Sequence, residues 1–582
     1  MFENFMKKID DLYNIILQRS DSINKLAAID SYRIMLNIEE KNSFSDEYYK
    51  FSRINKEDGV VYTPYEIAVF IIENLIKPED IINNPYLKIL DPACGCGNLI
   101  VPCFKYLREL FLRNLQEINY KNHMSLKEED ITTHIIDYNL HGTDIDVKAL
   151  KILLIDLYSI SGYIKESNFA AKDFLVDNIE EKFDIFIGNP PYVGHKLVDR
   201  EYSRLLKEKY KGIYKDKGDI SYCFFKKAIN SMSKKGKLSF ITSRYFLESQ
   251  SGEELRRILK EETTIHKIVD FYGIRPFKKV GIDPTIIFLS NEKVEENRIE
   301  VIKPLIAKGK GKNDFYESLF INKGSSYKSF SILERDLEDK GWSLISEKEK
   351  NIIRKIEKKG YDTLGNICNS YQGIITGCDK AFVIDDEIIL KEDIEKGIVK
   401  PWIKSSFIQQ NRIERERQFL IYSNLIDKEE EYPNSIRYIS EYKERLANRR
   451  ECKKGFRKWY ELQWGRKQEI FEGEKIIFPY KASSNRFALD KGSYFSADVY
   501  SLVLKEKGVL TYDYLLYILN SKVYEFYFKT FGKKLGEDLF EYYPNKLMEL
   551  TIPYIEDCTG NEDDTYLYDY FGLTEEEIGI IE

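Results

Sequence analysis

The stretch Ile89-Leu90-Asp91-Pro92-Ala93-Cys94-Gly95-Cys96-Gly97-Asn98 decides the fold of this 582-residue chain. An apolar run ends in an acid and a turn of small residues, and an apolar helical pattern follows. Small residues let backbone N–H groups approach a ligand at the carboxyl edge of a parallel sheet. A Gly-x-Gly turn is also an ordinary tight turn, so this stretch alone leaves both interpretations open.

The region from about 60 to 290 alternates short β-rich runs with longer amphipathic stretches. This alternation predicts an α/β fold, with a mostly parallel sheet that carries helices on both faces. The expected strands lie at 87–90, 139–142, 183–187, 237–241, 265–269 and 284–289.

The rest of the chain lacks this rhythm. We predict an N-terminal helical segment at 1–55, the α/β domain at 56–300, a charged connector at 301–345 and a second, mixed α/β domain at 346–582 with an acidic tail. The first 50 residues carry no recognisable chemistry.

Composition narrows the class of protein. Apolar residues make up 43% and charged residues 32%, and there is no run of about 18 uncharged apolar residues and no basic leader. We therefore expect a cytoplasmic protein without membrane contact. The eight cysteines include no Cys-x-x-Cys pair and all five histidines lie at or before His266, so no metal site is expected.

The formal charge of −7 is unfavourable for a protein that binds nucleic acid, because phosphates attract Lys and Arg. The charge is unevenly distributed, however. Residues 441–470 contain ten Lys or Arg and five Asp or Glu. A basic face on an acidic protein is therefore possible.

A second motif, Gly142-Thr143-Asp144-Ile145-Asp146, ends the next expected strand with an acid. A carboxylate at that position can bind both hydroxyls of a ribose. It can also simply cap the helix that starts at Val147.

The third motif, Asn189-Pro190-Pro191-Tyr192, directly follows the strand at 183–187. Two prolines fix the backbone, so the Pro190 carbonyl is a rigid acceptor. Together with the Asn189 carboxamide oxygen, it can hold both hydrogens of a planar amine and turn the nitrogen lone pair toward an electrophile. Tyr192 offers a flat face for a base. The alternative is a plain Pro-Pro turn with an Asn cap.

These motifs, in this order, resemble those of the gamma-class, TaqI-like N6-adenine DNA methyltransferases. The resemblance implies a Rossmann-like class I methyltransferase domain with a seven-stranded sheet, followed by a target recognition domain. It implies S-adenosylmethionine as the cofactor. The implied cofactor-binding residues are Tyr62, Thr63, Asp91, Pro92, Ala93, Cys94, Gly95, Asp144, Ile145, Asp173 and Phe174. The implied catalytic residues are Asn189, Pro190, Pro191, Tyr192 and Phe277.

Three of these residues come from further motifs. Thr63 belongs to Val61-Tyr62-Thr63-Pro64, Phe174 to Lys172-Asp173-Phe174-Leu175, and Phe277 to Pro276-Phe277-Lys278-Lys279-Val280. Within the same class, the segments 189–196, 244–249, 372–380 and 448–453 resemble clostridial orphan adenine methyltransferases.

The expected reaction transfers a methyl group to N6 of an adenine flipped out of duplex DNA. Neither a metal nor a covalent intermediate is required. The second domain is expected to read DNA, because it interleaves cations, amides and aromatic residues. The candidates are Asn448, Arg449, Arg450, Lys453, Arg457, Lys458, Trp459, Gln463, Trp464, Lys481, Asn485 and Arg486. A solvated helix face with a few packed Trp residues is the alternative.

Two rival functions stay open. Methyltransferases that act on a protein glutamine or a ribosomal RNA base use the same Asn-Pro-Pro-Tyr chemistry, but they generally lack a large C-terminal domain. A catalytically idle DNA-binding protein is the second rival. Because only 60 residues precede the Thr63 motif, we expect modification without cleavage. We further expect a monomer that works at the nucleoid without an obligate protein partner.

Overall fold

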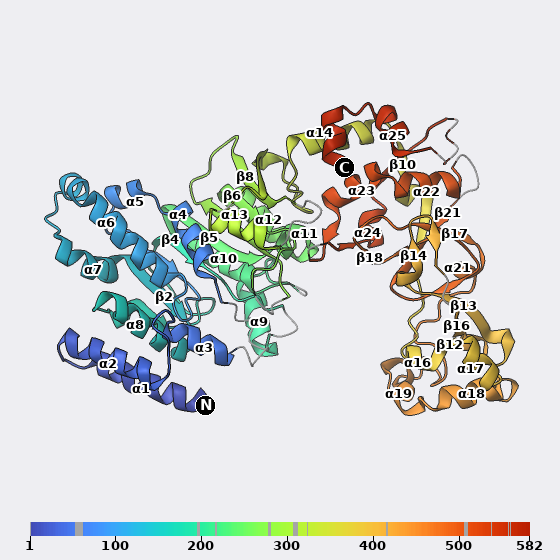
Figure 1. The fold of residues 1–582 in the computed structure, drawn as a ribbon, viewed down its shortest axis with the longest axis horizontal. Coiled ribbons are helices and arrows are strands. Elements are labelled where there is room, and N and C mark those ends of the chain that lie inside the picture. The colour runs from blue at the N-terminus through green and yellow to red at the C-terminus, as the bar shows by residue number, and fades with distance from the viewer. Residues whose placement is uncertain are drawn as a thin grey trace. The chain divides into compact units, whose positions relative to one another are not determined.

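The computed structural model describes residues 2–52, 62–194, 198–215, 218–277, 281–305, 312–322, 324–414, 417–505, 510–536, 538–556, 558, 560 and 562–582. The chain forms two compact units, Met1–Leu344 and Ile345–Glu582, drawn in Figure 1 from blue to yellow-green and from yellow to red. The predicted boundary at 55/56 lies outside the described residues, as do Val61, residues 195–196 and Lys278-Lys279-Val280 of the sequence motifs.

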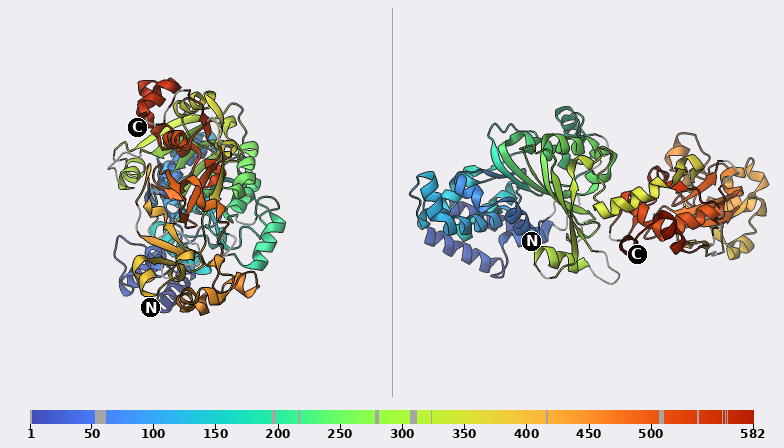
Figure 2. Two further views of the ribbon diagram at one scale, coloured as in Figure 1. Left: turned by 90° about the vertical axis from the view of Figure 1, so that its right-hand side faces the viewer. Right: turned by 90° about the horizontal axis from the view of Figure 1, so that it is seen from above.

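The first unit is built on one twisted sheet, visible in the right-hand view of Figure 2. Among the described residues, nine strands follow the order β3-β2-β1-β4-β5-β7-β6-β8-β9. They are β1 Ile89–Asp91, β2 Leu140–Asp144, β3 Phe169–Ala171, β4 Phe183–Gly188, β5 Met232–Ser243, β6 Thr264–Asp270, β7 Pro284–Ser290, β8 Arg298–Pro304 and β9 Tyr327–Leu333. Strands β1 to β5 pair in parallel, whereas β7 and β9 are antiparallel to their neighbours.

Successive residues of each central strand enter two different hydrophobic clusters. Ile89 and Ile185 belong to one cluster, and their neighbours Leu90 and Phe186 belong to the other. Because side chains alternate across a strand, the sheet is buried on both faces. The covering helices are α4 Tyr65–Leu75, α5 Pro78–Asn83, α6 Ile100–Asn122, α7 Ile131–His134, α8 Val147–Ser161, α9 Arg200–Lys209, α10 Ser221–Ser231, α11 Tyr245–Glu248, α12 Glu253–Glu262 and α13 Lys312–Phe320. The predicted α/β class is confirmed.

The sheet is larger than the seven strands expected. The predicted connector at 301–345 instead contains most of β8, α13 and all of β9, and β8 pairs in parallel with β6. The sequence prediction missed these strands because Lys303, Glu300 and Lys328 interrupt their apolar pattern. The first unit therefore extends to Leu344, where a connector was expected.

The N-terminal helices α1 Phe2–Leu17, α2 Ser22–Met35 and α3 Phe44–Ser52 are part of the first unit. They lie beside α8 in Figure 1, and buried residues of α1 such as Ile9 and Leu12 join the cluster on one face of the sheet. Asp156 of α8 accepts hydrogen bonds from the backbone N–H groups of Phe44 and Ser45, both at 3.0 Å. This buried carboxylate therefore satisfies the first turn of α3.

The second unit combines small sheets with short helices. Its described strands form four-stranded sheets in the orders β11-β21-β17-β19 and β12-β16-β13-β20, a three-stranded sheet β18-β23-β22 and the pairs β10-β24 and β14-β15. The strands are β10 Gly360–Thr363, β11 Cys368–Gln372, β12 Val383–Asp385, β13 Val399–Ile403, β14 Ile408–Gln409, β15 Arg412–Ile413, β16 Gln418–Ile421, β17 Glu474–Pro479, β18 Lys481–Ala482, β19 Ala488–Lys491, β20 Tyr494–Phe495, β21 Val499–Leu504, β22 Lys533–Lys534, β23 Phe540–Glu541 and β24 Thr551–Pro553.

The helices of the second unit are mostly short. They are α14 Glu347–Lys358, α15 Leu364–Ile367, α16 Asp379–Phe382, α17 Asp386–Lys391, α18 Pro433–Ser440, α19 Lys443–Ala447, α20 Arg450–Lys453, α21 Glu469–Glu472, α22 Tyr512–Asn520, α23 Lys522–Phe531, α24 Pro544–Leu547, α25 Asp564–Phe571 and α26 Glu575–Ile581. The strands of this unit are two to six residues long. Because such short strands fix few residues of the connecting loops, the loops depend on buried polar contacts.

Across the described parts of both units, each helix is too short or too polar to cross a membrane.

Replacing Asp156 with Ala should loosen α3. The change leaves two buried N–H donors without an acceptor, each of which costs about 1–3 kcal/mol. We expect amides of 44–52 to exchange with deuterium at least about fivefold faster, measured by mass spectrometry. The control is Asp30→Ala, an exposed acid on α2. Equal exchange in the two variants would show that α3 is held by other contacts.

Candidate functional site

The order of strands in the first unit reverses between β1 and β4. Chain connections run outward from β1 to β2 and β3 on one side, and from β4 to β5 on the other. In open parallel sheets, ligands bind outside the carboxyl ends of the strands at such a reversal. Both Asp91, at the end of β1, and Asn189, just after β4, lie at this edge.

The turn after β1 is fastened to the end of β2. The Gly95 N–H donates to Asp144 Oδ2 at 2.7 Å, and the Cys94 N–H donates to the Thr143 carbonyl at 3.0 Å. Gly95 has a φ of +50°, where a side chain is strained, and an added Cβ would lie 3.2 Å from the hydroxyl of Tyr49. The turn is therefore a supported structure, and Gly95 is needed within it.

Asp144 keeps acceptor capacity at the predicted ribose-binding position. Its two carboxylate oxygens accept one backbone N–H each, from Gly95 at 2.7 Å and from Asp146 at 2.8 Å. A carboxylate offers about four lone-pair sites, so about two stay available. The next residue, Ile145, is 77% exposed. The remaining acceptor sites of Asp144 suit the two hydroxyls of a diol, and the exposed apolar side chain of Ile145 suits a flat ring beside it. Asp144 itself does not cap the helix, because Asp146 accepts the Lys148 N–H.

Asp91 is buried beneath the same turn. Its side chain is 2% exposed and accepts the Ala93 N–H at 3.1 Å. Burial, followed by the nearby charge of Asp144, raises the pKa of Asp91 to about 8, against the lowering effect of the Ala93 hydrogen bond. Its carboxyl is therefore mostly protonated at pH 7.

Two tyrosines of α3 support the turn and were missed in the sequence. The Tyr48 hydroxyl donates to Asp146 Oδ2 at 2.5 Å, and the Tyr49 hydroxyl accepts from Asn98 Nδ2 at 2.9 Å. The N-terminal segment, in which no chemistry was recognised, thus contacts the site. A pair of adjacent tyrosines in a polar helix gives no sequence signal for such a contact.

Asn189 is oriented from two sides. Its Nδ2 donates to Thr63 Oγ1 at 2.9 Å, and its Oδ1 accepts from the Tyr192 hydroxyl. The Tyr192 hydroxyl also lies 3.2 Å from the carbonyl oxygen of Ile241. Burial raises the pKa of Tyr192 well above its ordinary value, so this hydroxyl stays protonated. Thr63 and Asn189, 126 residues apart in sequence, therefore form one hydrogen-bonded group.

The carbonyl of Pro190 is the open acceptor of this motif. Pro190 is buried, and no described residue donates a hydrogen bond to its oxygen. Buried backbone carbonyls are rarely left in this state. Tyr192 and Phe277, predicted as aromatic walls, are themselves 6% and 5% exposed and contribute to the hydrophobic core.

The other predicted ligand-binding pair is occupied by protein contacts. Asp173 accepts the Leu175 N–H at 2.9 Å and the Tyr202 hydroxyl at 2.8 Å. The ring of Phe174 is 2% exposed and stacks on Phe224, with centroids 5.5 Å apart. Phe174 was predicted to pack on a ligand ring, whereas in this structure its ring contacts Phe186 of β4 and Phe224 of α10 in the core.

Two of the predicted DNA-contacting residues serve the fold of the second unit. The guanidinium of Arg449 donates to the carbonyls of Thr376, Trp459, Glu461 and Leu446 at 2.8–3.2 Å. Asn485 is 3% exposed, donates to the Leu519 carbonyl and accepts from Tyr542. Most polar atoms of these two side chains bond inside the unit, and their role as DNA contacts stays a prediction.

The other candidates are divided between exposed and engaged side chains. Arg457 pairs with Glu461, Gln463 donates to Glu451, Lys458 to the Asp427 carbonyl and Arg486 to the Lys481 carbonyl. Trp459 packs against Tyr460, and Trp464 is 43% exposed. The exposed polar candidates are Asn448, Arg450, Lys453, Lys458 and Lys481. Among the described residues, His, Cys, Asp and Glu side chains form no cluster of three suited to a metal.

Two protein-family models match separate parts of the chain. The model of the Eco57I restriction-modification methylase matches residues 108–277, and that of the TaqI-like C-terminal specificity domain matches residues 408–552. The first match lies in the sheet-bearing unit and the second in the other unit.

Individual proteins are similar over most of the chain. The Type II methyltransferase M.BstVI of Geobacillus stearothermophilus is 24% identical over 531 residues, which cover 87% of this chain and 91% of that protein. The Type II restriction enzyme and methyltransferase RM.Eco57I of Escherichia coli is 23% identical and covers 81% of this chain and 54% of that protein. The structure of the Type IIL restriction-modification enzyme MmeI with DNA shares the fold, with a TM-score of 0.57 at 15% identity, over 86% of this chain and 71% of that chain.

Arg449 and its neighbour Arg450 should differ sharply on replacement. Arg449→Ala removes hydrogen bonds from a charged group, each worth about 1.5–3 kcal/mol, and should lower the unfolding free energy of the second unit by at least that amount. Arg450→Ala, which removes an exposed side chain, should change it by less than about 0.5 kcal/mol. Hydrogen exchange of 374–380 and 459–463 measures the difference. Similar exchange in both variants would contradict the supporting role of Arg449.

Proposed function

We propose that this chain, which is an S-adenosylmethionine-dependent DNA methyltransferase of the restriction-modification kind, transfers its methyl group to N6 of an adenine flipped out of duplex DNA. The single observation that carries the proposal is the carbonyl of the buried Pro190, which accepts no hydrogen bond from a described residue, beside the oriented carboxamide of Asn189. Two fixed acceptors match the two hydrogens of an exocyclic amine.

The cofactor would lie at the carboxyl ends of β1 and β2. Asp144 keeps acceptor sites for ribose hydroxyls, and Ile145 offers an exposed apolar surface. We assign Asp91 to the positively charged end of the cofactor, and Tyr62 and Thr63 to its covering segment. When bound, S-adenosylmethionine supplies an electrophilic methyl carbon, so the protein's own task is alignment.

The proposed role of Asn189 and Pro190 is to hold the amine in one orientation. Thr63 fixes the amide end of Asn189, so its oxygen points in a constant direction. As positive charge develops on the nitrogen, both oxygens stabilise it, and no reorganisation is needed during the reaction. A separate general base is not part of this proposal.

Base stacking completes the site. Flipping costs a few kcal/mol, and stacking on an aromatic side chain returns about 1–3 kcal/mol. We assign this role to Tyr192 and Phe277. Because both rings are buried here, an entering base replaces contacts that they make with protein side chains.

Several finer statements stay predictions. They are adenine as the base, N6 as the atom, the absence of cleavage, a monomeric state and the likeness to the clostridial orphan methyltransferases. The alternative substrates, a protein glutamine or an RNA base, are distinguished by incubation of the enzyme with labelled cofactor and duplex DNA, RNA or protein. Gel analysis of the same DNA tests for cleavage.

Asn189→Ala should reduce methyl transfer to duplex DNA by at least about 100-fold, because one of two oxygens that stabilise the charge is lost. Cofactor affinity should stay within about twofold. The matched control is Asn178→Ala, which removes an exposed carboxamide in the loop between β3 and β4. Mass spectrometry of digested DNA identifies N6-methyladenine. Near-normal turnover of the Asn189 variant, or labelled cytosine in place of adenine, would overturn the proposal.

Cofactor binding should release a proton from Asp91. A cation within about 4–6 Å lowers a carboxyl pKa, and the pKa of Asp91 is about 8 without one. Because the bound state then holds fewer protons, affinity should rise with pH, by up to about tenfold per unit, and level off above pH 8. Calorimetry in two buffers of different ionisation enthalpy measures the released proton. Asp91→Asn should abolish the slope, and an unchanged slope would remove Asp91 from the binding site.

A further inference from the structure

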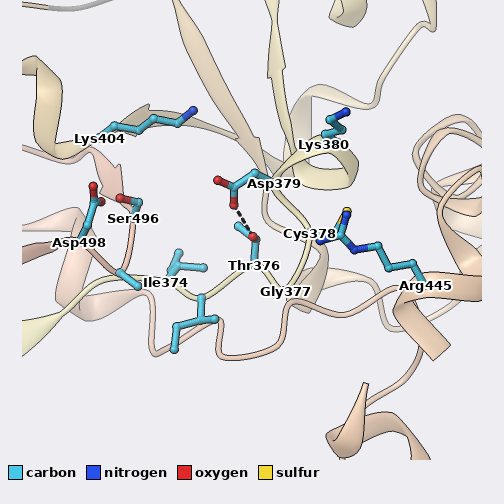
Figure 3. A pocket seen from close by; sticks show the side chains of 12 residues that line it. Ile374, Thr376, Gly377, Cys378, Asp379, Lys380, Lys404, Arg445, Ser496 and Asp498 are labelled. Carbon is cyan, nitrogen blue, oxygen red and sulfur yellow. Dashed lines mark hydrogen bonds between the residues drawn. The ribbon is translucent and has the colours of Figure 1, made fainter. Parts of the chain in front are cut away.

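The second unit contains a polar pocket of about 620 Å³, within the range of about 300–1,000 Å³ typical of ligand sites. Its lining comes from four separate parts of the chain. They are the loop at 374–380, Lys404 after β13, Arg445 of α19 and the turn at 496–498 between β20 and β21. Figure 3 shows Lys404 and Asp498 on one side, Asp379 between, and Cys378 and Arg445 on the other.

The loop at 374–380 is rigid by construction. Gly377 has a φ of +79°, and an added Cβ would lie 2.9 Å from Cδ and Nη1 of Arg449. Arg449 in turn donates to the Thr376 carbonyl at 3.2 Å. On the opposite side, the Ile374 N–H donates to the Phe495 carbonyl at 2.9 Å. The loop is therefore clamped between α19–α20 and β20, and its side chains have fixed starting points.

The pocket holds polar groups whose bonding capacity is not used. Asp379 accepts from Thr376 through Oδ1, while its Oδ2 has no donor among the described residues. The buried hydroxyl of Ser496 has no partner in the same part of the chain. The side chains of Lys380, Lys404 and Arg445 form no ion pair with any described residue. A ligand with both donors and acceptors would satisfy this set.

The mixture of charges distinguishes between possible ligands. A site for phosphate alone has no use for an open carboxylate, because like charges repel. The edges of bases present amino donors beside ring and carbonyl acceptors, and Asp accepts from the N4 amino group of cytosine. Lys and Arg at the margin then match the phosphates on either side. The matched specificity model covers Arg445 and the turn at 496–498.

We propose that this pocket is where the second unit reads DNA, with Asp379 accepting an exocyclic base amine and Lys404 and Arg445 holding the flanking phosphates. The inference rests on the proposed function, since it assigns a place to the DNA that the first unit methylates. It also gives Arg449 a role, because its side chain positions the loop at 374–380 through the Thr376 carbonyl.

Asp379→Asn is the sharpest variant. It keeps an oxygen for Thr376 but can replace the open acceptor with an N–H donor. After the methylated sequence is established with the wild-type enzyme, methylation is measured on that duplex and on duplexes with one base pair changed. We expect discrimination at one position to fall about 5- to 150-fold, with cofactor affinity unchanged. The control is Asp569→Asn, an exposed acid of α25.

Lys404→Ala and Arg445→Ala test the phosphate contacts independently. Each should weaken duplex binding on all sequences at least about fivefold and reduce the slope of log affinity against log salt by about 0.9. Lys358→Ala is the matched control, because Lys358 is an exposed cation on α14, which contributes no residue to the pocket. Melting curves of each variant verify that the unit is folded.

Different results would overturn the pocket assignment and the proposed function. If the wild-type enzyme methylates duplex DNA while the three pocket variants match their controls in discrimination, affinity and salt slope, the pocket does not contact DNA and the proposed function stands. If the wild-type enzyme transfers no methyl group to DNA under conditions in which it binds cofactor, the proposed function fails and the pocket assignment fails with it.

Discussion

The hydrogen bond from the Gly95 N–H to the Asp144 carboxylate is the contact on which the rest of the site depends. It joins the end of β1 to the end of β2, and Gly95 must take a φ of +50° to make it. The turn then rests on the hydroxyl of Tyr49 below and leaves lone pairs of Asp144 open above. The Gly95 N–H therefore links the conformation of the turn to the number of Asp144 lone pairs that a ligand can use.

The second unit uses charge inside as well as outside. Lys475 and Asp490 pair at 2.7 Å with no exposed side-chain surface, and Arg449 spends its guanidinium on backbone carbonyls. Short strands cannot hold long connections by themselves, so buried polar groups take over that task. A count of basic residues in the sequence therefore overstates the number of cations available at the surface. Fewer Lys and Arg side chains can contact a ligand than the composition indicates.

The sequence was most informative where chemistry needs one residue type at one place. Asp91 and Asp144 end strands and Asn189 directly follows one, and the position of each at the sheet edge could be read from that order. It was least informative where partners are distant. Nothing near Arg449 indicates that Thr376 and Glu461 accept from it, and charged residues hid β8 and β9 within an apparent connector. Phe174 shows the same limit. An aromatic residue next to an acid has the same sequence pattern whether its ring packs in the core or against a ligand.

The helices before the first motif have a consequence for how the protein is divided. Since Tyr48 and Tyr49 of α3 reach Asp146 and the glycine turn, and Asp156 of α8 fastens α3, the opening fifty residues act as a brace for that turn. A shortened version cut just ahead of Val61 would retain every recognisable motif yet lose that brace. The shortest active form of the enzyme is thus longer than the segment that contains its motifs.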